Sequence, residues 1–426
     1  MSTVRRLAPG PGDVELESLL DELRVAPVVE PFGDLALEAC DAVARALFRD
    51  PAARSHPDLI ALASWLRRPN TARLASEARS LGMRVPRGLA FHVPPANVDA
   101  ITMYSLALSI LAGNRNIVRL SSRAGVAAAR ICAALDEALG APELAPIRAG
   151  TAILTWEREL SATAVCSAAC DVRLVWGGDE TVRALRSLPV SPGAKDVSFI
   201  DRFSLAAISV DAWHATGERA REELARRLCN DAYWFDQQGC SSPRLVAWCG
   251  DPQRAASASE DLFARLAGAL TARGYELPLG AVTAKLAWIA GAAIDRPLTR
   301  VRDHGNELSI LTLSTLTGLD REHCGAGTFL EVTLPALADL APHVSPRDQT
   351  LAVYGFPRAE LERFVRLAGG RGVDRIVPFG EALSFDHRWD GMNLLTELTR
   401  QVTISTGHVA LGSLALGSVA LGSLAA

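Results

Sequence analysis

GLAFHVPPANVDAITMYSLALSILAGNRNIVRL, residues 88–120, decides the fold of this chain. GLAFHV and NIVRL are short apolar runs typical of buried strands. The apolar stretch VDAITMYSLALSILAG between them is long enough for a buried helix that ends at Gly113. A strand, a helix and a strand in this order predict a parallel pair of strands whose crossover is the helix.

The same alternation continues to about residue 210. Strand-like TAILTW (151–156), VRLVWG (172–177) and LAAISV (205–210) are separated by segments whose apolar residues have helical spacing. Strands that alternate with helices predict a mostly parallel sheet with helices on both faces, which is the α/β class. A second α/β region follows the amphipathic segment 214–230, with strands expected near 244–248, 308–313, 328–334 and 349–354.

These patterns predict how the chain divides into domains. Residues 1–84 show helical spacing and are expected to pack on a first α/β domain at 85–212, which is followed by a second at 213–371. The glycine-flanked, apolar start of 372–404 indicates a segment that returns to the first domain or contacts another subunit. The remainder, 405–426, contains the tandem pentapeptides VALGS, LALGS and VALGS. We expect a low-complexity extension there; a docking or targeting peptide is the alternative.

Composition excludes several classes of protein. The chain has 426 residues, 49% of them hydrophobic and 22% charged, and its formal net charge of -4 does not favour nucleic acid binding. No apolar run predicts a membrane span, and the start MSTVRRLAPGPGDVELESLL lacks the apolar stretch of a secretion signal. The eight cysteines contain no CxxC pair, so neither a disulfide framework nor a zinc or other metal site is expected. We predict free thiols in a reducing cytoplasm.

One cysteine has the setting of a nucleophile. In NDAYWFDQQGCSSPRLVAW (230–248), Cys240 follows a glycine and precedes two serines and Pro243. The glycine lets a substrate carbonyl approach the sulfur, and the proline stops a helix from continuing. A thiolate in this turn can attack a carbonyl or thioester carbon. A buried cysteine that acts as a small hydrophobic residue is the plainer interpretation, and it suits Cys132, Cys166, Cys170, Cys229, Cys249 and Cys324.

Other catalytic signatures are missing from the sequence. There is no HExxH, P-loop or GxGxxG, and the eight histidines form no Ser-His-Asp or Cys-His arrangement. The missing GxGxxG argues against a standard dinucleotide fold, although other folds bind nicotinamide cofactors.

Four segments resemble the LuxC family of fatty acyl-CoA reductases, a branch of the aldehyde dehydrogenase superfamily. They are FHVPPANVDAITMYSLALSILAGNRNIVRLSSR (91–123), LVWGGDETVRALR (174–186), WFDQQGCSSPRLV (234–246) and GVDRIVPFGEALSFDHRWDGMNLLTELTRQVTI (372–404). The third is the most specific, because it combines the nucleophile with its surroundings. The resemblance implies an aldehyde dehydrogenase-like fold, with a Rossmann-like nicotinamide-cofactor-binding domain at 85–212 and an α/β catalytic domain at 213–371.

The resemblance also implies catalytic roles. Cys240 matches the acyl-accepting cysteine, and Asn97 is similar in position to an asparagine whose amide donates to the developing oxyanion with the Cys240 backbone N–H. One such donor is typically worth about 3–4 kcal/mol of barrier. From the local sequence alone, Asn97 is equally well a turn residue.

Cofactor contacts follow from the same resemblance. Arg119 stands where the superfamily has a lysine on the cofactor ribose, and Ser121 lies beside it without the acid that favours a free 2′-hydroxyl. This favours NADPH, with NADH as the alternative. Gly177 and Gly178 match the turn near the pyrophosphate, where an ordinary turn capped by Asp179 is the plainer interpretation. Glu331 is similar to a glutamate on the nicotinamide ribose; an exposed strand carboxylate is the alternative.

One departure from the superfamily indicates the reaction. Hydrolytic aldehyde dehydrogenases have an ELGGK glutamate that activates water, whereas this chain reads KDVSFIDRFSLAAI and Asp201 is not clearly equivalent. The resemblance therefore implies reduction of an acyl-CoA or acyl-carrier thioester to an aldehyde by a homo-oligomeric enzyme. The alternatives are a hydrolytic aldehyde dehydrogenase that uses the same cysteine and a non-redox acyltransferase on this fold.

Overall fold

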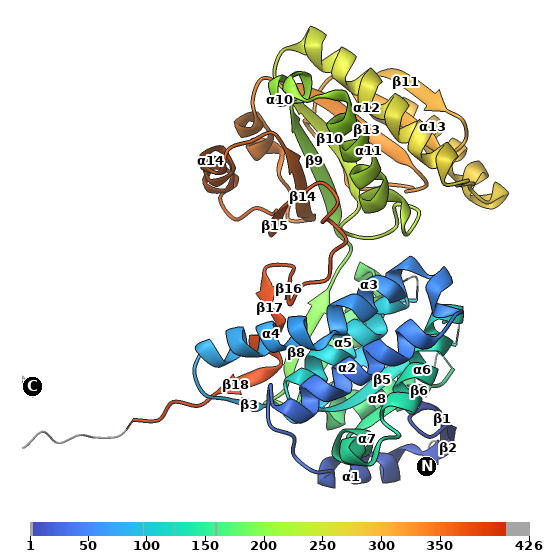
Figure 1. The fold of residues 1–426 in the computed structure, drawn as a ribbon, viewed down its shortest axis with the longest axis vertical. Coiled ribbons are helices and arrows are strands. Elements are labelled where there is room, and N and C mark those ends of the chain that lie inside the picture. The colour runs from blue at the N-terminus through green and yellow to red at the C-terminus, as the bar shows by residue number, and fades with distance from the viewer. Residues whose placement is uncertain (1–2, 97, 123, 158–159, 406–426) are drawn as a thin grey trace, which may run out of the picture.

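The computed structural model describes residues 3–96, 98–122, 124–157 and 160–405, and it contains two α/β domains stacked along the long axis (Figure 1). Each domain is built on a seven-stranded sheet. Among the described residues, no helix is both long and apolar enough to cross a membrane.

The first sheet has the strand order β2-β1-β6-β5-β4-β7-β8. Its parallel strands are β4 (Leu89–Val93), β5 (Arg115–Leu120), β6 (Thr151–Thr155), β7 (Val172–Trp176) and β8 (Lys195–Phe199). The stretch 88–120 forms β4, α5 (Ala100–Leu111) and β5 as predicted, and all twelve residues of α5 are buried. This explains why α5 is apolar on every side.

Helices cover both faces of this sheet. One face packs against α1 (Leu16–Val25), α8 (Leu160–Ala169) and α9 (Asp179–Arg186). The other face packs against α5 and α2 (Asp34–Arg49), α3 (Pro57–Leu66), α4 (Arg68–Ser80) and α6 (Val126–Ala138). The short α7 (Ala145–Ala149) precedes β6.

The N-terminal segment is only partly helical, which corrects the expectation for residues 1–84. β1 (Thr3–Ala8) pairs antiparallel with β6, and β2 (Gly12–Glu15) pairs antiparallel with β1. The first helix, α1, therefore starts only at Leu16. The edge of β6 that these residues extend lies some 150 positions later in the chain, so local spacing does not reveal it.

The second sheet has the order β11-β12-β13-β10-β9-β14-β15, and only β11 runs antiparallel to its neighbour. Its strands are β9 (Phe203–Ser209), β10 (Pro243–Cys249), β11 (Leu298–His304), β12 (Leu308–Leu313), β13 (Thr328–Leu334), β14 (Asp348–Tyr354) and β15 (Arg375–Pro378). One face packs against α10 (Val210–Ala215), α11 (Glu218–Tyr233) and α12 (Pro252–Ala272), and the other against α13 (Leu279–Asp295) and α14 (Arg358–Ala368).

The chain crosses between the domains earlier than expected. β9 falls inside the range 85–212 assigned to the first domain, yet it is hydrogen-bonded between β10 and β14 of the second sheet. The crossing therefore occurs at residues 200–202, directly after β8. An apolar strand does not reveal which sheet it joins, because its hydrogen bonds are made with residues far along the chain.

The C-terminal segment joins both domains. β15 still belongs to the second sheet, and the chain then descends through the hairpin of β16 (Arg388–Trp389) and β17 (Met392–Asn393) to the first domain (Figure 1). After α15 (Leu394–Glu397), β18 (Thr399–Gln401) pairs with β3 (Arg84–Pro86). The predicted pentapeptide tail lies outside the described residues.

Candidate active site

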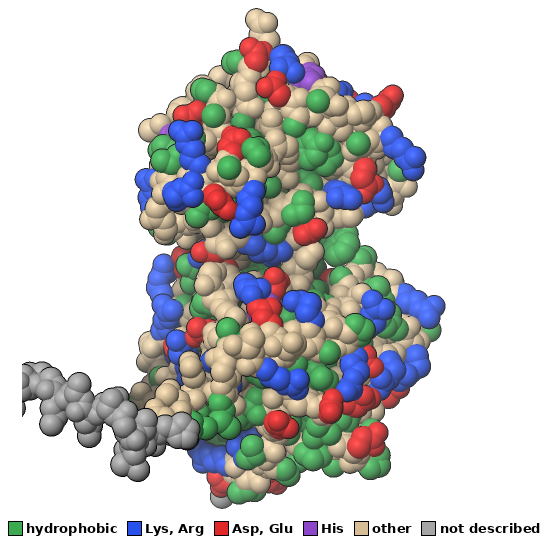
Figure 2. All heavy atoms as spheres, turned by 60° about the vertical axis from the view of Figure 1, so that its left-hand side comes forward, with side chains coloured by type: hydrophobic (Ala, Val, Ile, Leu, Met, Phe, Trp, Pro, Cys, Tyr) green, Lys and Arg blue, Asp and Glu red, His purple; other side chains and the backbone are tan. Residues whose placement is uncertain are grey.

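A cavity of about 370 Å³ lies between the two domains. The first domain contributes the carboxyl ends of β7 and β8, and the second contributes the Cys240 turn and the amino ends of β9 and β14. The molecule narrows at this level (Figure 2). The carboxyl edge of a parallel sheet is where α/β proteins bind ligands.

Aromatic rings form the apolar wall of the cavity on the first-domain side. Trp176 and Phe199 end β7 and β8, and their rings stack with centroids 3.5 Å apart and planes inclined by 10°. Trp389 from the C-terminal hairpin lies at 6.3 Å from the Trp176 ring, and Phe385 also lines the cavity. The wall can therefore hold an apolar or planar group beside the sulfur.

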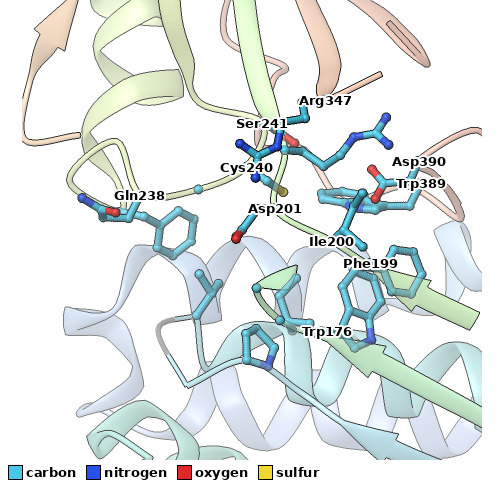
Figure 3. A pocket seen from close by; sticks show the side chains of 18 of the residues that line it. Trp176, Phe199, Ile200, Asp201, Gln238, Cys240, Ser241, Arg347, Trp389 and Asp390 are labelled. Carbon is cyan, nitrogen blue, oxygen red and sulfur yellow. The ribbon is translucent and has the colours of Figure 1, made fainter. Parts of the chain in front are cut away.

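Cys240 lies in a turn between α11 and β10 that side-chain hydrogen bonds hold in place. Gln237 holds this turn: its Nε2 donates to the Pro243 carbonyl at 2.8 Å and its Oε1 accepts from the Thr328 N–H at 2.9 Å. A Cβ at Gly239 would lie 3.1 Å from Ser242 Oγ, so a glycine is favoured before the cysteine. Cys240 projects into the space between the domains, with Asp390 beside it (Figure 3).

The charge state of Cys240 depends on opposing effects. Burial raises the pKa of the thiol and the negative charge of Asp390 raises it further, whereas the hydrogen bond from Gln349, the charge of Arg244 and the Ser241 hydroxyl lower it. Buried cysteines such as Cys40 and Cys249 have a pKa raised to about 12 by desolvation. Among the cysteines, all of which are described, Cys240 alone lines the cavity.

The two glycines after β7 line the cavity, but a carboxylate of the protein already accepts a hydrogen bond at the N-terminus of the following helix, α9. Gly178 is the N-cap of α9, which corrects the alternative that Asp179 caps this helix. The Asp201 carboxylate accepts from the Asp179 N–H at 3.3 Å, and a Cβ at Gly178 would lie 3.0 Å from Asp201 Oδ2. A negative side chain thus already stabilises the helix N-terminus. Gly177 and Gly178 offer close approach of the backbone, not a vacant anion site.

Arg119 and Ser121 lie at the carboxyl end of β5, on the same edge of the first sheet but outside the cavity lining. The Arg119 guanidinium is 5.7 Å from the centroid of the Trp156 ring. Such a cation–π contact holds the arginine at the sheet edge.

The structure does not bring Glu331 to the cavity. Glu331 is 5% exposed, and its carboxylate accepts from Arg302 at 2.6 Å, Ser259 at 2.6 Å, Thr312 at 2.7 Å and Trp248 at 3.2 Å. The expected contact of Glu331 with the nicotinamide ribose is therefore wrong, and so is the alternative that Glu331 is an exposed strand carboxylate. The carboxylate that does line the cavity is Glu322, nine positions earlier, paired with Arg347 at 3.1 Å.

Four arginines line the cavity, and three of them are paired with carboxylates. Arg202 pairs with Asp374, Arg321 with Asp348, and Arg347 with Asp179 and Glu322. Arg244 instead donates to the carbonyls of Arg202 at 3.1 Å and Gln237 at 3.4 Å. Within the described part of the chain, no carboxylate forms an ion pair with Arg244, so its positive charge acts on the cavity and the sulfur.

Comparison with known proteins identifies the family. The sequence model of the acyl-CoA reductase (LuxC) family matches residues 64–286, just over half of the chain. The chain belongs to the LuxC family. The predicted resemblance is therefore confirmed.

A curated relative and several solved structures are also similar. A long-chain acyl-protein thioester reductase of Aliivibrio fischeri is 25% identical over 169 residues, a match that covers 39% of this LuxC chain and about a third (33%) of the relative. Aldehyde dehydrogenase 21 of Physcomitrella patens covers 90% of this chain and 89% of its own, with TM-score 0.66 and 12% identity. An NAD-dependent aldehyde dehydrogenase of Sinorhizobium meliloti covers 94% and 90%, with TM-score 0.65 and 13% identity. The predicted aldehyde dehydrogenase-like fold is confirmed.

Two other sequence expectations concern this LuxC-family site. Asn97, the expected oxyanion donor, lies outside the described residues. The described residues contain no cluster of histidine, cysteine and carboxylate side chains that could hold a metal ion.

Sequence reasoning missed two residues beside the sulfur, Gln349 at the start of β14 and Asp390 in the β16–β17 hairpin. Asp390 and Gly391 have φ of 49° and 72°, the conformation of an Asp-Gly hairpin turn. The WDGM sequence at 389–392 could have predicted that turn, but not its neighbours.

Proposed function

We propose that this LuxC-family chain reduces an acyl thioester to an aldehyde through an acyl-Cys240 intermediate, with NADPH as the hydride donor. The observation that carries the proposal is the position of Cys240 in a cavity between the carboxyl edge of one sheet and the amino edge of the other. The carrier of the acyl group is coenzyme A or a protein; the name of the Aliivibrio fischeri relative, an acyl-protein thioester reductase, adds support for a protein.

In the first chemical step, Cys240 Sγ bonds to the thioester carbonyl carbon and the carbon–sulfur bond of the carrier breaks. The carrier leaves as its thiol with the proton that Cys240 gave up. The Cys240 backbone N–H has no acceptor among the described residues and can donate to the oxyanion; Asn97 is our second proposed donor. The stacked Trp176 and Phe199 hold apolar groups beside the sulfur and exclude water.

The cavity residues fit a nicotinamide cofactor, which supplies hydride to the acyl carbon when bound. Gly177 and Gly178 allow its close approach, and the Glu322 carboxylate can accept from ribose hydroxyls. Arg119, with Ser121 beside it, places a guanidinium at the end of β5, where it can pair with a 2′-phosphate; this supports NADPH. Glu331 takes no part in this binding, because its carboxylate is fully engaged within the second domain.

The surroundings of Cys240 favour thioester chemistry over hydrolysis. After β8 the chain has Ile200, which has no proton-accepting group, followed by Asp201, whose carboxylate is engaged at the start of α9. The Asp390 carboxylate beside the sulfur is engaged as the acceptor of the hydrogen bond from Gln349 Nε2. Attack by water on an acyl-cysteine needs a placed base, whereas thiol exchange needs less help. The hydrolytic aldehyde dehydrogenase reaction therefore has less support here.

The test is a mixture of protein, NADPH and acyl-CoA thioesters from acetyl to palmitoyl, with loss of nicotinamide absorbance as the readout. Cys240→Ala should abolish turnover, and Cys324→Ala, which removes a half-buried thiol outside the cavity lining, should retain it. Acyl-Cys240 detected by intact mass without NADPH oxidation would instead support an acyltransferase. Turnover that survives Cys240→Ala would refute the mechanism.

A further inference from the structure

The sulfur of Cys240 has a protein hydrogen-bond donor that the reaction above does not yet use. Gln349 Nε2 lies 3.5 Å from Cys240 Sγ. Gln349 is 2% exposed and belongs to β14, 109 residues beyond the cysteine. A buried amide that contacts the reacting atom can take part in the chemistry at that atom.

We propose that Gln349 is a second catalytic residue, which stabilises the Cys240 thiolate by donating an amide N–H to Sγ, and that Asp390 and Ser241 are positioning residues that hold this amide in its donating orientation. The proposal deepens the thioester reductase function and rests on it.

The hydrogen bonds of Gln349 determine which way its amide points. Oε1 accepts from the Ser241 hydroxyl at 2.7 Å and from the Thr350 hydroxyl at 3.3 Å, and Nε2 donates to Asp390 Oδ1 as well as to the sulfur. A flipped amide would turn its oxygen towards the Asp390 carboxylate and lose the donor to the sulfur. Each of the two N–H bonds of Nε2 thus has its own acceptor.

The positioning groups come from different parts of the fold. Ser241, 1% exposed, follows the nucleophile directly, whereas Asp390 is at the tip of the C-terminal hairpin. The neighbour of Asp390 in that hairpin, Trp389, belongs to the core of the first domain. The contact between Gln349 and Asp390 therefore joins the second domain to the segment that packs on the first.

The charges that face the sulfur explain why a donor is needed. Asp390 raises the pKa of the thiol, while Arg244 on β10 lowers it, and Arg375 on β15 also interacts with Cys240. Burial raises the pKa of Asp390 itself and the charge of Asp374 adds to this, whereas the charge of Arg202 and the hydrogen bond from Gln349 oppose it. Burial also raises the pKa of the thiol and so disfavours the thiolate. The N–H of Gln349 opposes this effect because it donates a hydrogen bond directly to the charged sulfur.

The amide serves the reaction at both steps in which Sγ carries charge. It stabilises the thiolate before Sγ bonds to the acyl carbon, and it stabilises the thiolate again when the thiohemiacetal alkoxide, which hydride addition to the acyl carbon leaves, collapses. In that collapse the Sγ–carbon bond breaks, its electron pair returns to sulfur and the carbonyl of the aldehyde forms.

The test measures the rate of Cys240 alkylation by iodoacetamide against pH, followed by intact mass, in the full chain without substrate. Gln349→Met keeps the shape and removes the donor, so the pH midpoint should rise by about one unit, which is about a tenfold lower rate near neutrality. Gln253→Met, an exposed glutamine on α12, is the matched control and should leave the midpoint unchanged. An unchanged midpoint in Gln349→Met would overturn the proposal, even if turnover fell.

Two changes at Asp390 separate its charge from its positioning role. Asp390→Asn removes the charge and keeps an acceptor for Nε2, so the midpoint should fall below that of the wild type. Asp390→Ala removes both, so its midpoint should lie above that of Asp390→Asn; equal midpoints would refute the positioning role. Because alkylation needs no thioester, the expected shifts without any thioester reduction would refute the proposed function and leave the role of Gln349 intact.

Discussion

Replacing Glu331 tests whether this carboxylate is structural. All its observed contacts lie within the second domain: Arg302, Ser259, Thr312 and Trp248 all donate to it. The side chains of Arg302 and Glu331 are 8% and 7% exposed, so the ion pair between them is shielded from water. Glu331→Gln keeps the volume and one acceptor oxygen but removes the charge.

The expected loss of stability follows from those contacts. A hydrogen bond to a charged group contributes about 1.5–3 kcal/mol, and breaking a buried ion pair costs about 3–5 kcal/mol because the remaining charge is unpaired. Arg302 retains Glu260 at 3.2 Å as a partner, so we expect a loss below that of a broken buried ion pair, about 2–3 kcal/mol, which is the size of one hydrogen bond to a charged group. Glu362→Gln, in an exposed pair with Arg358, should cost about 0.3–0.5 kcal/mol.

Urea unfolding followed by tryptophan fluorescence measures the difference, and initial rates against NADPH concentration give the KM. We expect a lower unfolding midpoint for Glu331→Gln and an unchanged KM for NADPH. A raised KM at unchanged stability would refute it and would return Glu331 to the cofactor site that the sequence resemblance suggested.

Three further predictions concern the cofactor, the cavity and pH. Arg119→Ala should raise the KM for NADPH more than that for NADH, by about tenfold, since only NADPH has a 2′-phosphate; equal effects in steady-state assays would exclude that contact. Trp176→Ala removes a ring that is 5% exposed and stacked on Phe199, so it should lower the free energy of unfolding by about 3–5 kcal/mol in the same urea titration. Burial raises the pKa of Asp231 from its ordinary 3.8 to about 7, so the folded state holds a proton that the unfolded state has lost. Its contribution to stability should therefore fall as pH rises from about 4 to about 7, and Asp231→Asn should remove that part of the pH dependence of the unfolding midpoint.

Local sequence was enough to predict the α/β class and to single out Cys240 as the candidate nucleophile. The alternation of β4, α5 and β5 is visible in residues 88–120, because an element buried on every side must be apolar throughout. Cys240 can be recognised as a candidate nucleophile because its own turn contains a glycine, which leaves room beside the sulfur, and a proline, which stops a helix from continuing. These signals depend on a few consecutive residues, and the family resemblance uses the same segments.

The residues around the sulfur depend on the tertiary structure. Gln349 and Asp390 lie 41 residues apart and meet only because the second sheet and the returning hairpin bring them to one place. Glu331 shows the converse. Its position in the sequence suggested a contact with the cofactor ribose, but its carboxylate is engaged within the second domain. Hydrogen bonds between distant residues leave no periodic pattern in the sequence, so only the folded chain decides which polar groups meet at Cys240 and which are held elsewhere.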